Sequence, residues 1–120
     1  MRVNTDLSPL DELIGQQLSA VTFVQDYIQV WFDGPGLNIT NPLTVKAASS
    51  ELKSWAPGFR DLLCGQIAKV VSRVHHQDGV ALTIAFSDEC ELSVSLREVD
   101  YSSPEAFCAH GLKNGVSIVG

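Results

Sequence analysis

Two short motifs carry side chains that could bind a metal ion or take part in catalysis. His75 and His76 are adjacent and lead into Asp78-Gly79, whereas Cys108 and His110 are two residues apart. Imidazole and thiolate groups are common zinc ligands, and a thiolate beside a base can act as a nucleophile. If the motifs converge in space, they could form a small-molecule or metal site, with or without an enzymatic activity.

Local geometry weighs against either motif acting alone. Neighbouring residues of a strand point to opposite faces, so His75 and His76 are not expected to share one ion. Cys108 and His110 are expected near the end of a short helix. A spacing of two residues places their side chains on different faces of that helix, and the helix dipole disfavours a thiolate at its C-terminal end. An exposed turn for the histidine pair and a packing role for Cys108 are the simpler interpretations. Convergence of all four side chains is kept as the alternative hypothesis.

The charge balance favours a basic protein partner over nucleic acid. The 120 residues include 8 Lys and Arg against 14 Asp and Glu, for a net charge of −6. Binding to a polyanion needs a basic surface, whereas an acidic surface can attract a cationic protein. Acidic residues concentrate between residues 87 and 105, where Tyr101 could anchor a partner; a solvated surface is the alternative explanation. Trp31, on the polar face of its own predicted strand, could be a second anchor. The predicted partner-binding residues are Asp88, Glu89, Glu91, Glu98, Asp100, Tyr101, Glu105 and Trp31.

Several functional classes have no support in the sequence. Neither dinucleotide-binding, P-loop nor nucleophile-elbow spacing is present, so no enzyme and no cofactor is predicted. No stretch approaches ~18 consecutive apolar residues, and the first residues lack the apolar segment of a secretory signal. Three cysteines, Cys64, Cys90 and Cys108, indicate reduced thiols in a cytoplasm. Cys64 and Cys90 lie in apolar patterns and are predicted to be buried.

An internal repeat organises the chain. Leu13-Ile14-Gly15-Gln16 recurs as Leu63-Cys64-Gly65-Gln66, and alternating apolar residues follow each copy. The matching predicted strands are residues 28–32 with 82–86, and residues 37–39 with 92–94. The predicted fold class is α+β, a single domain over 1–120 made of two similar antiparallel β-meander halves with short helices.

Glycine and proline set the predicted boundaries. Ser8-Pro9 begins a short helix that ends at Gly15, and a counterpart runs over residues 57–63. Ser103-Pro104 begins a further short helix that ends near Gly111. The halves cover approximately 8–47 and 57–97, with residues 41–58 as the connector and residues 116–119 as a closing strand.

Five segments together resemble a group of small, acidic, uncharacterised bacterial proteins. These segments are 13–16 (LIGQ), 24–29 (VQDYIQ), 59–63 (FRDLL), 94–97 (VSLR) and 100–106 (DYSSPEA). In size and charge such proteins are similar to immunity proteins of contact-dependent and other polymorphic toxin systems. The resemblance implies an intracellular binder that occludes a toxin domain, often a basic nuclease. It implies no catalytic residue.

Three hypotheses follow. The leading one is a non-enzymatic, cytoplasmic binding protein of the immunity type, steered to a basic toxin domain by its acidic surface, with no nucleic-acid or membrane partner. The alternative is a small-molecule or metal site, enzymatic or not, formed by His75, His76, Cys108 and His110. The third is a homo-oligomer that pairs through the closing strand at a free sheet edge.

Overall fold

Alternating apolar residues build two antiparallel sheets that share one core. The structure is a computed structural model and describes residues 7–47, 49–112 and 118–120. In spatial order the first sheet contains β1 (Ala20–Val24), β2 (Tyr27–Trp31), β3 (Gly36–Ile39), β9 (Phe107–His110) and β10 (Ile118–Val119). The second sheet contains β5 (Ser50–Lys53), β4 (Leu43–Ala47), β8 (Glu91–Ser95), β7 (Ala81–Phe86) and β6 (Val71–Gln77).

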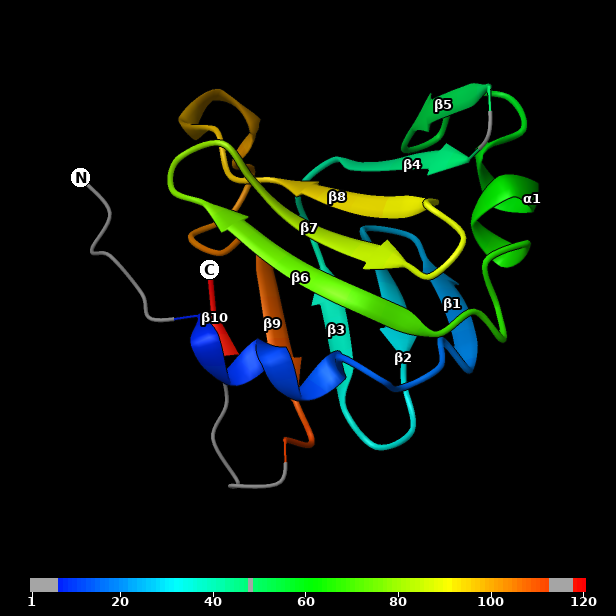
Figure 1. The fold of residues 1–120 in the computed structure, drawn as a ribbon. Helices are drawn as coiled ribbons and strands as arrows, with labels where there is room; N and C mark the ends of the chain where they lie inside the picture. Colours follow the sequence, from blue (N-terminus) through cyan, green and yellow to red (C-terminus); the bar gives the residue numbers. More distant parts are fainter. Residues whose placement is uncertain (1–6, 48, 113–117) are drawn as a thin grey trace.

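Three short helical segments accompany the sheets: η1 (Ser8–Leu13), α1 (Phe59–Cys64) and η2 (Glu98–Asp100). The strands of the second sheet run across those of the first, with η1 packed along β6 and α1 beside β1, β4 and β5 (Figure 1). The α+β prediction therefore holds at the coarse level, although sheets dominate. No helix in the described ranges is long and apolar enough to cross a membrane.

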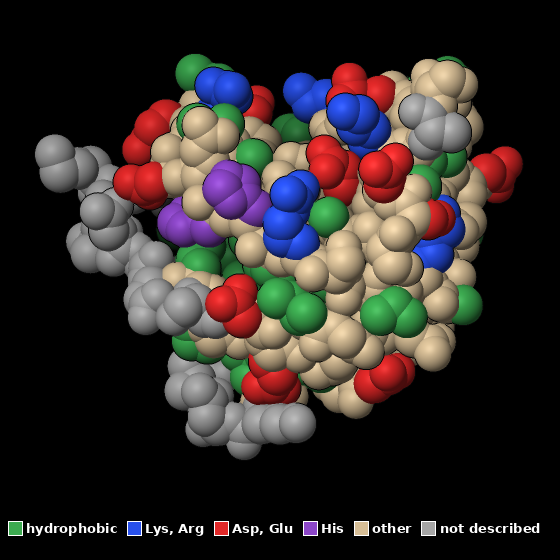
Figure 2. All heavy atoms as spheres, viewed as in Figure 1, with side chains coloured by type: hydrophobic (Ala, Val, Ile, Leu, Met, Phe, Trp, Pro, Cys, Tyr) green, Lys and Arg blue, Asp and Glu red, His purple; other side chains and the backbone are tan. Residues whose placement is uncertain are grey.

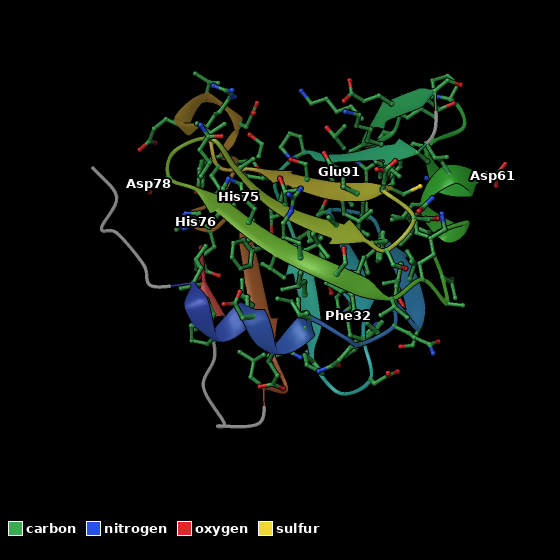
Figure 3. All side chains as sticks on the ribbon, in the orientation of Figure 1. Phe32, Asp61, His75, His76, Asp78 and Glu91 are labelled. Carbon is green, nitrogen blue, oxygen red and sulfur yellow. The ribbon has the colours of Figure 1, made fainter. Side chains whose placement is uncertain are left out.

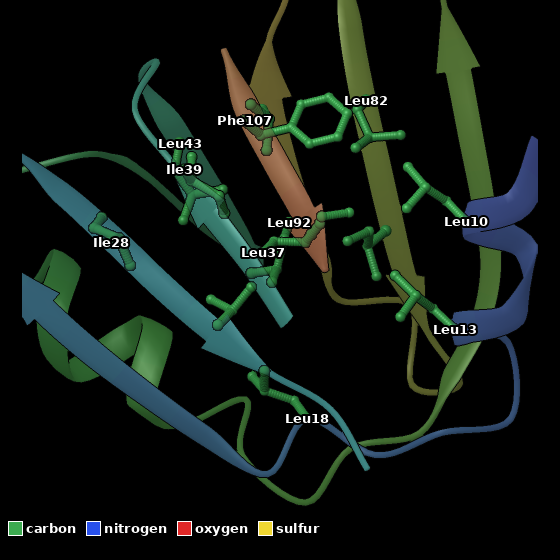
Figure 4. Packing of buried hydrophobic residues seen from close by; sticks show 14 of the residues in the cluster. Leu10, Leu13, Leu18, Ile28, Leu37, Ile39, Leu43, Leu82, Leu92 and Phe107 are labelled. Atoms are coloured by element: carbon green, nitrogen blue, oxygen red, sulfur yellow. The ribbon is translucent and has the colours of Figure 1, made fainter. Parts of the chain in front are cut away.

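The two-residue alternation predicted for the strands is confirmed. Ile28 and Val30 of β2 are buried, while Gln29 between them lies partly exposed on the outer face. Leu82 and Ile84 of β7 are buried in the same way. Each such side chain contributes roughly 1.5–3 kcal/mol by leaving water, so the alternation fixes which face of each sheet turns inward. Figure 4 shows side chains from both sheets and η1 meeting in this core, among them Leu10, Leu13, Ile39, Leu92 and Phe107.

The internal repeat has a structural counterpart. Gln16 donates its side-chain Nε2 hydrogen bond to the carbonyl oxygen of Glu12 at 2.9 Å, and Gln66 donates the same bond to Leu62 at 2.9 Å. Each glutamine therefore forms a hydrogen bond with the last turn of a helical segment, at equivalent positions in the two halves of the chain. A three-stranded meander follows each time, β1–β2–β3 and then β6–β7–β8.

Each half then contributes a hairpin to the sheet of the other half. The hairpin β4–β5 follows β3 but pairs with β8, and the hairpin β9–β10 follows β8 but pairs with β3. The two sheets, read as β1-β2-β3-β9-β10 and β6-β7-β8-β4-β5, therefore match strand for strand. The segments that precede β1 and β6 also pair, through an isolated bridge between Gln17 and Val70.

Two sequence-based assignments need correction. The predicted connector 41–58 contains the hairpin β4–β5 of the second sheet, because Leu43 and Val45 alternate inward and are buried in the shared core. The helix predicted from Ser103 to near Gly111 is instead the strand β9, whose Phe107 and Ala109 face the core at a period of two. Ser103-Pro104 therefore lies in a turn that precedes a strand and does not begin a helix.

Smaller differences concern the helices, one cysteine and the end of the chain. The first helical segment is a 3-10 helix, and the second begins at Phe59 rather than Pro57. Cys90 is buried as predicted, but Cys64 is exposed because it lies on the outer side of α1. Of the predicted closing strand, Ile118–Val119 form β10, whereas residues 116 and 117 lie outside the described residues.

Candidate partner-binding surface

The predicted acidic residues do not form one patch. Asp88 and Glu89 occupy the turn that precedes β8, whereas Glu98 and Asp100 lie in η2, beyond the other end of that strand. Glu105 lies exposed just before β9. The length of β8 therefore separates the two acidic pairs, so a partner that docks on one pair does not automatically contact the other.

Glu91 lies on the outer face of the second sheet among residues of both charges. Across the sheet it pairs with Lys46 of β4, and Lys46 pairs in turn with Glu51 of β5. Figure 2 shows the same mixture on this face, with blue and red side chains interspersed over the upper strands. Such an arrangement is typical of a solvated sheet face rather than a single-sign docking patch.

The turn before β8 uses one of its carboxylates internally. Lys69 Nζ lies 2.7 Å from Asp88 Oδ2, and the backbone N–H of Cys90 donates to Asp88 Oδ1 at 3.1 Å. The hydrogen bond from Lys69 lowers the pKa of Asp88 and raises the pKa of Lys69. The carboxylate of Asp88 therefore takes part in interactions within the protein. In the same turn the neighbouring Glu89 adopts a left-handed backbone conformation with φ of 71°.

The two predicted aromatic anchors are tied to the fold. Tyr101 is partly buried and packs against the core. Trp31 lies on the outer face of the first sheet, where its ring meets His110 edge-on with centroids 5.2 Å apart. Both rings lean over Gly36, because a Cβ on that residue would come within 2.7 Å of Trp31 and 2.8 Å of His110. His110 Nε2 also lies 3.4 Å from Asn38 Oδ1 on the same face.

The alternative metal or catalytic set does not converge. His75 and His76 belong to β6 of the second sheet and are exposed (Figure 3), whereas Cys108 and His110 belong to β9 of the first. The described part of the chain contains no group of three or more His, Cys, Asp or Glu side chains able to hold a metal ion. Burial raises the pKa of the Cys108 thiol, and the charge of Glu105 raises it further, which opposes formation of a nucleophilic thiolate.

The most unusual surface residue is Trp55, between β5 and α1. Its side chain remains 49% exposed, and its backbone adopts a left-handed conformation with φ of 69°. That conformation costs a residue with a Cβ roughly 1–2 kcal/mol, and such outliers concentrate at functional sites. An exposed tryptophan in a strained backbone is therefore the strongest single indication of a binding surface on this molecule.

Trp55 belongs to an aromatic and basic group, the Trp55 cluster (Phe23, Trp55, Phe59 and Arg60). Its ring centroid lies 6.3 Å from that of Phe23 and 6.1 Å from that of Phe59. The guanidinium of Arg60 lies 5.3 Å from the Trp55 ring and 5.6 Å from the Phe23 ring, within cation–π range. Because Phe59 is fully buried, the cluster is anchored in the core at one end and reaches solvent at the other.

A hollow of about 290 Å³ adjoins Trp55 where β3 crosses to β4, and it is called the Trp55 hollow below. Its lining comes from the β1–β2 turn, the β3–β4 link, the end of β5 and η2, so four segments distant in sequence meet there. Asp100 of the predicted set lies in this lining. Two further hollows lie on the other sides of Trp55, one of them bounded by Phe23 and Arg60.

Sequence reasoning overlooked this surface because it treated residues 41–58 as a connector. One signal was present: a tryptophan between Ser54 and Ala56-Pro57, in a segment with turn character, has no alternating pattern to bury it. Binding residues often lie in such loops, and tryptophan is enriched among the residues that dominate interfaces. The proximity of Asp26 and Asp100 to Trp55, in contrast, depends on tertiary structure.

No protein-family model matches the chain, and comparisons with curated proteins and with solved structures found no significant match. The candidate surface therefore rests on geometry and chemistry alone.

Proposed function

We propose that this chain is a non-enzymatic binding protein of the immunity type, which binds a basic toxin domain and neutralises it. The exposed Trp55 in its left-handed backbone carries the proposal. Glycine adopts positive φ without steric cost, so the backbone of this turn does not by itself require a tryptophan. A half-exposed aromatic side chain at such a position therefore supports a binding role.

The composition of the Trp55 cluster supports a protein partner. Residues that dominate interfaces are most often Trp, Tyr and Arg, and they lie beside pockets that a partner's side chains fill. Trp55 and Arg60 are of these types, and hollows flank Trp55 on several sides. The buried Phe59 packs edge-on against Trp55, and a contact of this kind reduces the conformational entropy that the tryptophan side chain would lose when a partner docks.

The net charge of −6 supports a basic partner. Because the acidic residues are spread over several surfaces rather than gathered in one patch, we assign them long-range steering rather than direct contact. Steering of this kind raises the association rate and weakens as salt is added. We place the encounter in the cytoplasm, which fits three free cysteines.

A growth experiment tests the proposal. The basic protein captured at low salt from a lysate of the source organism is expressed alone and together with this chain. The captured protein is expected to stop growth alone, and the wild-type chain is expected to restore growth. Trp55→Ala should fail to restore growth, whereas Ile14→Ala should succeed, because Ile14 is also apolar and 46% exposed but lies beside η1, outside the Trp55 cluster.

Circular dichroism of both variants checks that they are folded. Equal restoration of growth by Trp55→Ala and the wild type would remove Trp55 from the binding surface. A captured protein that is harmless when expressed alone, or the absence of any stoichiometric partner at low salt, would overturn the immunity function itself.

A further inference from the structure

We propose that the Trp55 hollow is a receptor for one arginine side chain of the partner. This inference rests on the proposed binding function and specifies its chemistry. At about 290 Å³ the hollow lies just below the roughly 300–1,000 Å³ that ligand pockets occupy, which suits one long side chain better than a cofactor.

The walls of the hollow suit the non-polar parts of an arginine. Ile28 and Ile39, both almost fully buried, contribute to the lining and offer an apolar surface to the methylene groups. Tyr27 and Trp55 contribute aromatic rings. A guanidinium is weakly hydrated and stacks on aromatic faces more readily than an ammonium, so arginine is favoured over lysine.

The charged groups of the lining have a net negative sum. Asp26 comes from the β1–β2 turn and Asp100 from η2, and Lys53 at the end of β5 is the one cation among the described residues of the lining. Two carboxylates on different segments can receive hydrogen bonds from different sides of one planar guanidinium. The positive charge of Lys53 repels a bound guanidinium. Removal of that charge should therefore strengthen the binding of arginine, which would not happen if the hollow bound only apolar groups.

Asp100 is held in a defined position. Ser95 Oγ donates a hydrogen bond of 2.5 Å to Asp100 Oδ2, and the backbone N–H of Asp100 donates to the carbonyl of Arg97 at 2.9 Å. A carboxylate fixed in advance loses less entropy when it binds a cation. Each oxygen of a carboxylate accepts more than one hydrogen bond, so the bond from Ser95 leaves capacity for a ligand.

An unsatisfied acceptor in the same lining is an independent indication of a donor ligand. Asn41 is only 3% exposed, and its Nδ2 donates to the carbonyl of Ser95 at 2.8 Å. Its Oδ1 is buried and accepts no hydrogen bond from the residues that the structure describes. A buried acceptor without a donor costs about 1–3 kcal/mol, which a ligand rich in N–H groups would recover by a small adjustment of the lining.

The test is an NMR titration of the intact protein with N-acetyl-arginine amide, with N-acetyl-citrulline amide as the neutral analogue of the same shape. The arginine amide is expected to shift the Trp55 indole signal and the amide signals of Tyr27 and Asn41 in a saturable manner. The citrulline amide should leave them in place. Asp100→Asn should weaken the binding of the arginine amide at least about fivefold, because the substitution removes a charge-assisted hydrogen bond.

Two further variants separate a specific site from net charge. Lys53→Gln should strengthen binding about twofold by removing the opposing cation. Asp11→Asn removes an equal negative charge from η1, outside the lining and outside the Trp55 cluster, and should leave the affinity unchanged. Equal shifts with the citrulline amide, equal losses for Asp11→Asn and Asp100→Asn, or preference for N-acetyl-lysine amide would each overturn the arginine assignment. The proposed function would survive that failure if growth restoration still depended on Trp55.

Discussion

Trp55 combines a strained backbone with an exposed ring, and the two properties can be separated by substitution. Glycine relieves the left-handed conformation at φ of 69°, whereas alanine removes the ring but keeps the strain. Trp55→Gly is therefore expected to be about 1 kcal/mol more stable than Trp55→Ala in urea unfolding, with both variants unable to neutralise the partner. If the alanine variant were equally or more stable, the backbone at this position would not be strained, and the main reason for assigning Trp55 to function would fail.

Gly36 shows the opposite case, a residue whose small size the fold requires. A Cβ there would lie within 2.8 Å of both the Trp31 and the His110 ring, so the rings would have to move. Gly36→Ala is expected to lower the free energy of unfolding by about 1–3 kcal/mol, as overpacking usually does. In a Trp31→Ala background the same change should cost at least about 1 kcal/mol less, because one obstructing ring is gone. Equal costs in both backgrounds would contradict the contact.

At the scale of elements, the partly exposed ion pair of Asp88 with Lys69 stabilises the turn between β7 and β8. The pKa of Asp88 is lowered below its ordinary value of 3.8, so the carboxylate stabilises the fold above that pH and loses the contribution as pH falls through the lowered pKa. Asp88→Asn should be less stable than the wild type at pH 7, and the difference should disappear in strong acid. Glu89→Gln is the neighbouring control. A difference that persisted unchanged at pH 2 would show that the loss has another cause.

The elements with a clear periodicity of apolar residues were predictable from the sequence. Elements whose structure depends on pairing with a strand distant in sequence were not. Ile28 and Val30 alternate along β2, and Leu82 and Ile84 alternate along the first part of β7; this pattern alone indicates their buried face. The strand β9 covers only Phe107–His110 and follows Ser-Pro, so its local signal resembled the start of a helix. Its identity as a strand depends on pairing with β3, which is distant in sequence.

At the scale of the whole molecule, the exchange of hairpins makes the two halves interdependent. Without β9 and β10 the first sheet has only three strands, and without β4 and β5 so does the second. Fragments 1–56 and 57–120 are therefore expected to be unfolded when separate and to recover β-sheet circular dichroism when mixed in equal amounts. A separate fragment that gave a cooperative unfolding transition would contradict this interdependence.

The candidate surface is also a property of the whole molecule. The sequence supplied its net charge and one of its residues, Asp100, but the sequence-based patch joined residues that β8 holds apart. Trp55 and Asp26 meet Asp100 only because the chain crosses from β3 to β4 beside η2. The net charge follows directly from the sequence, whereas a contact surface depends on which segments the topology brings together.

The affinity of the captured basic partner, compared between Trp55→Ala and Ile14→Ala by isothermal titration calorimetry, tests the central claim most directly. We expect Trp55→Ala to weaken binding at least about 30-fold, as loss of a dominant interface residue of roughly 2 kcal/mol implies. Ile14→Ala should bind as tightly as the wild type. Equal affinity for both variants would show that the partner, if it binds at all, binds elsewhere on the molecule.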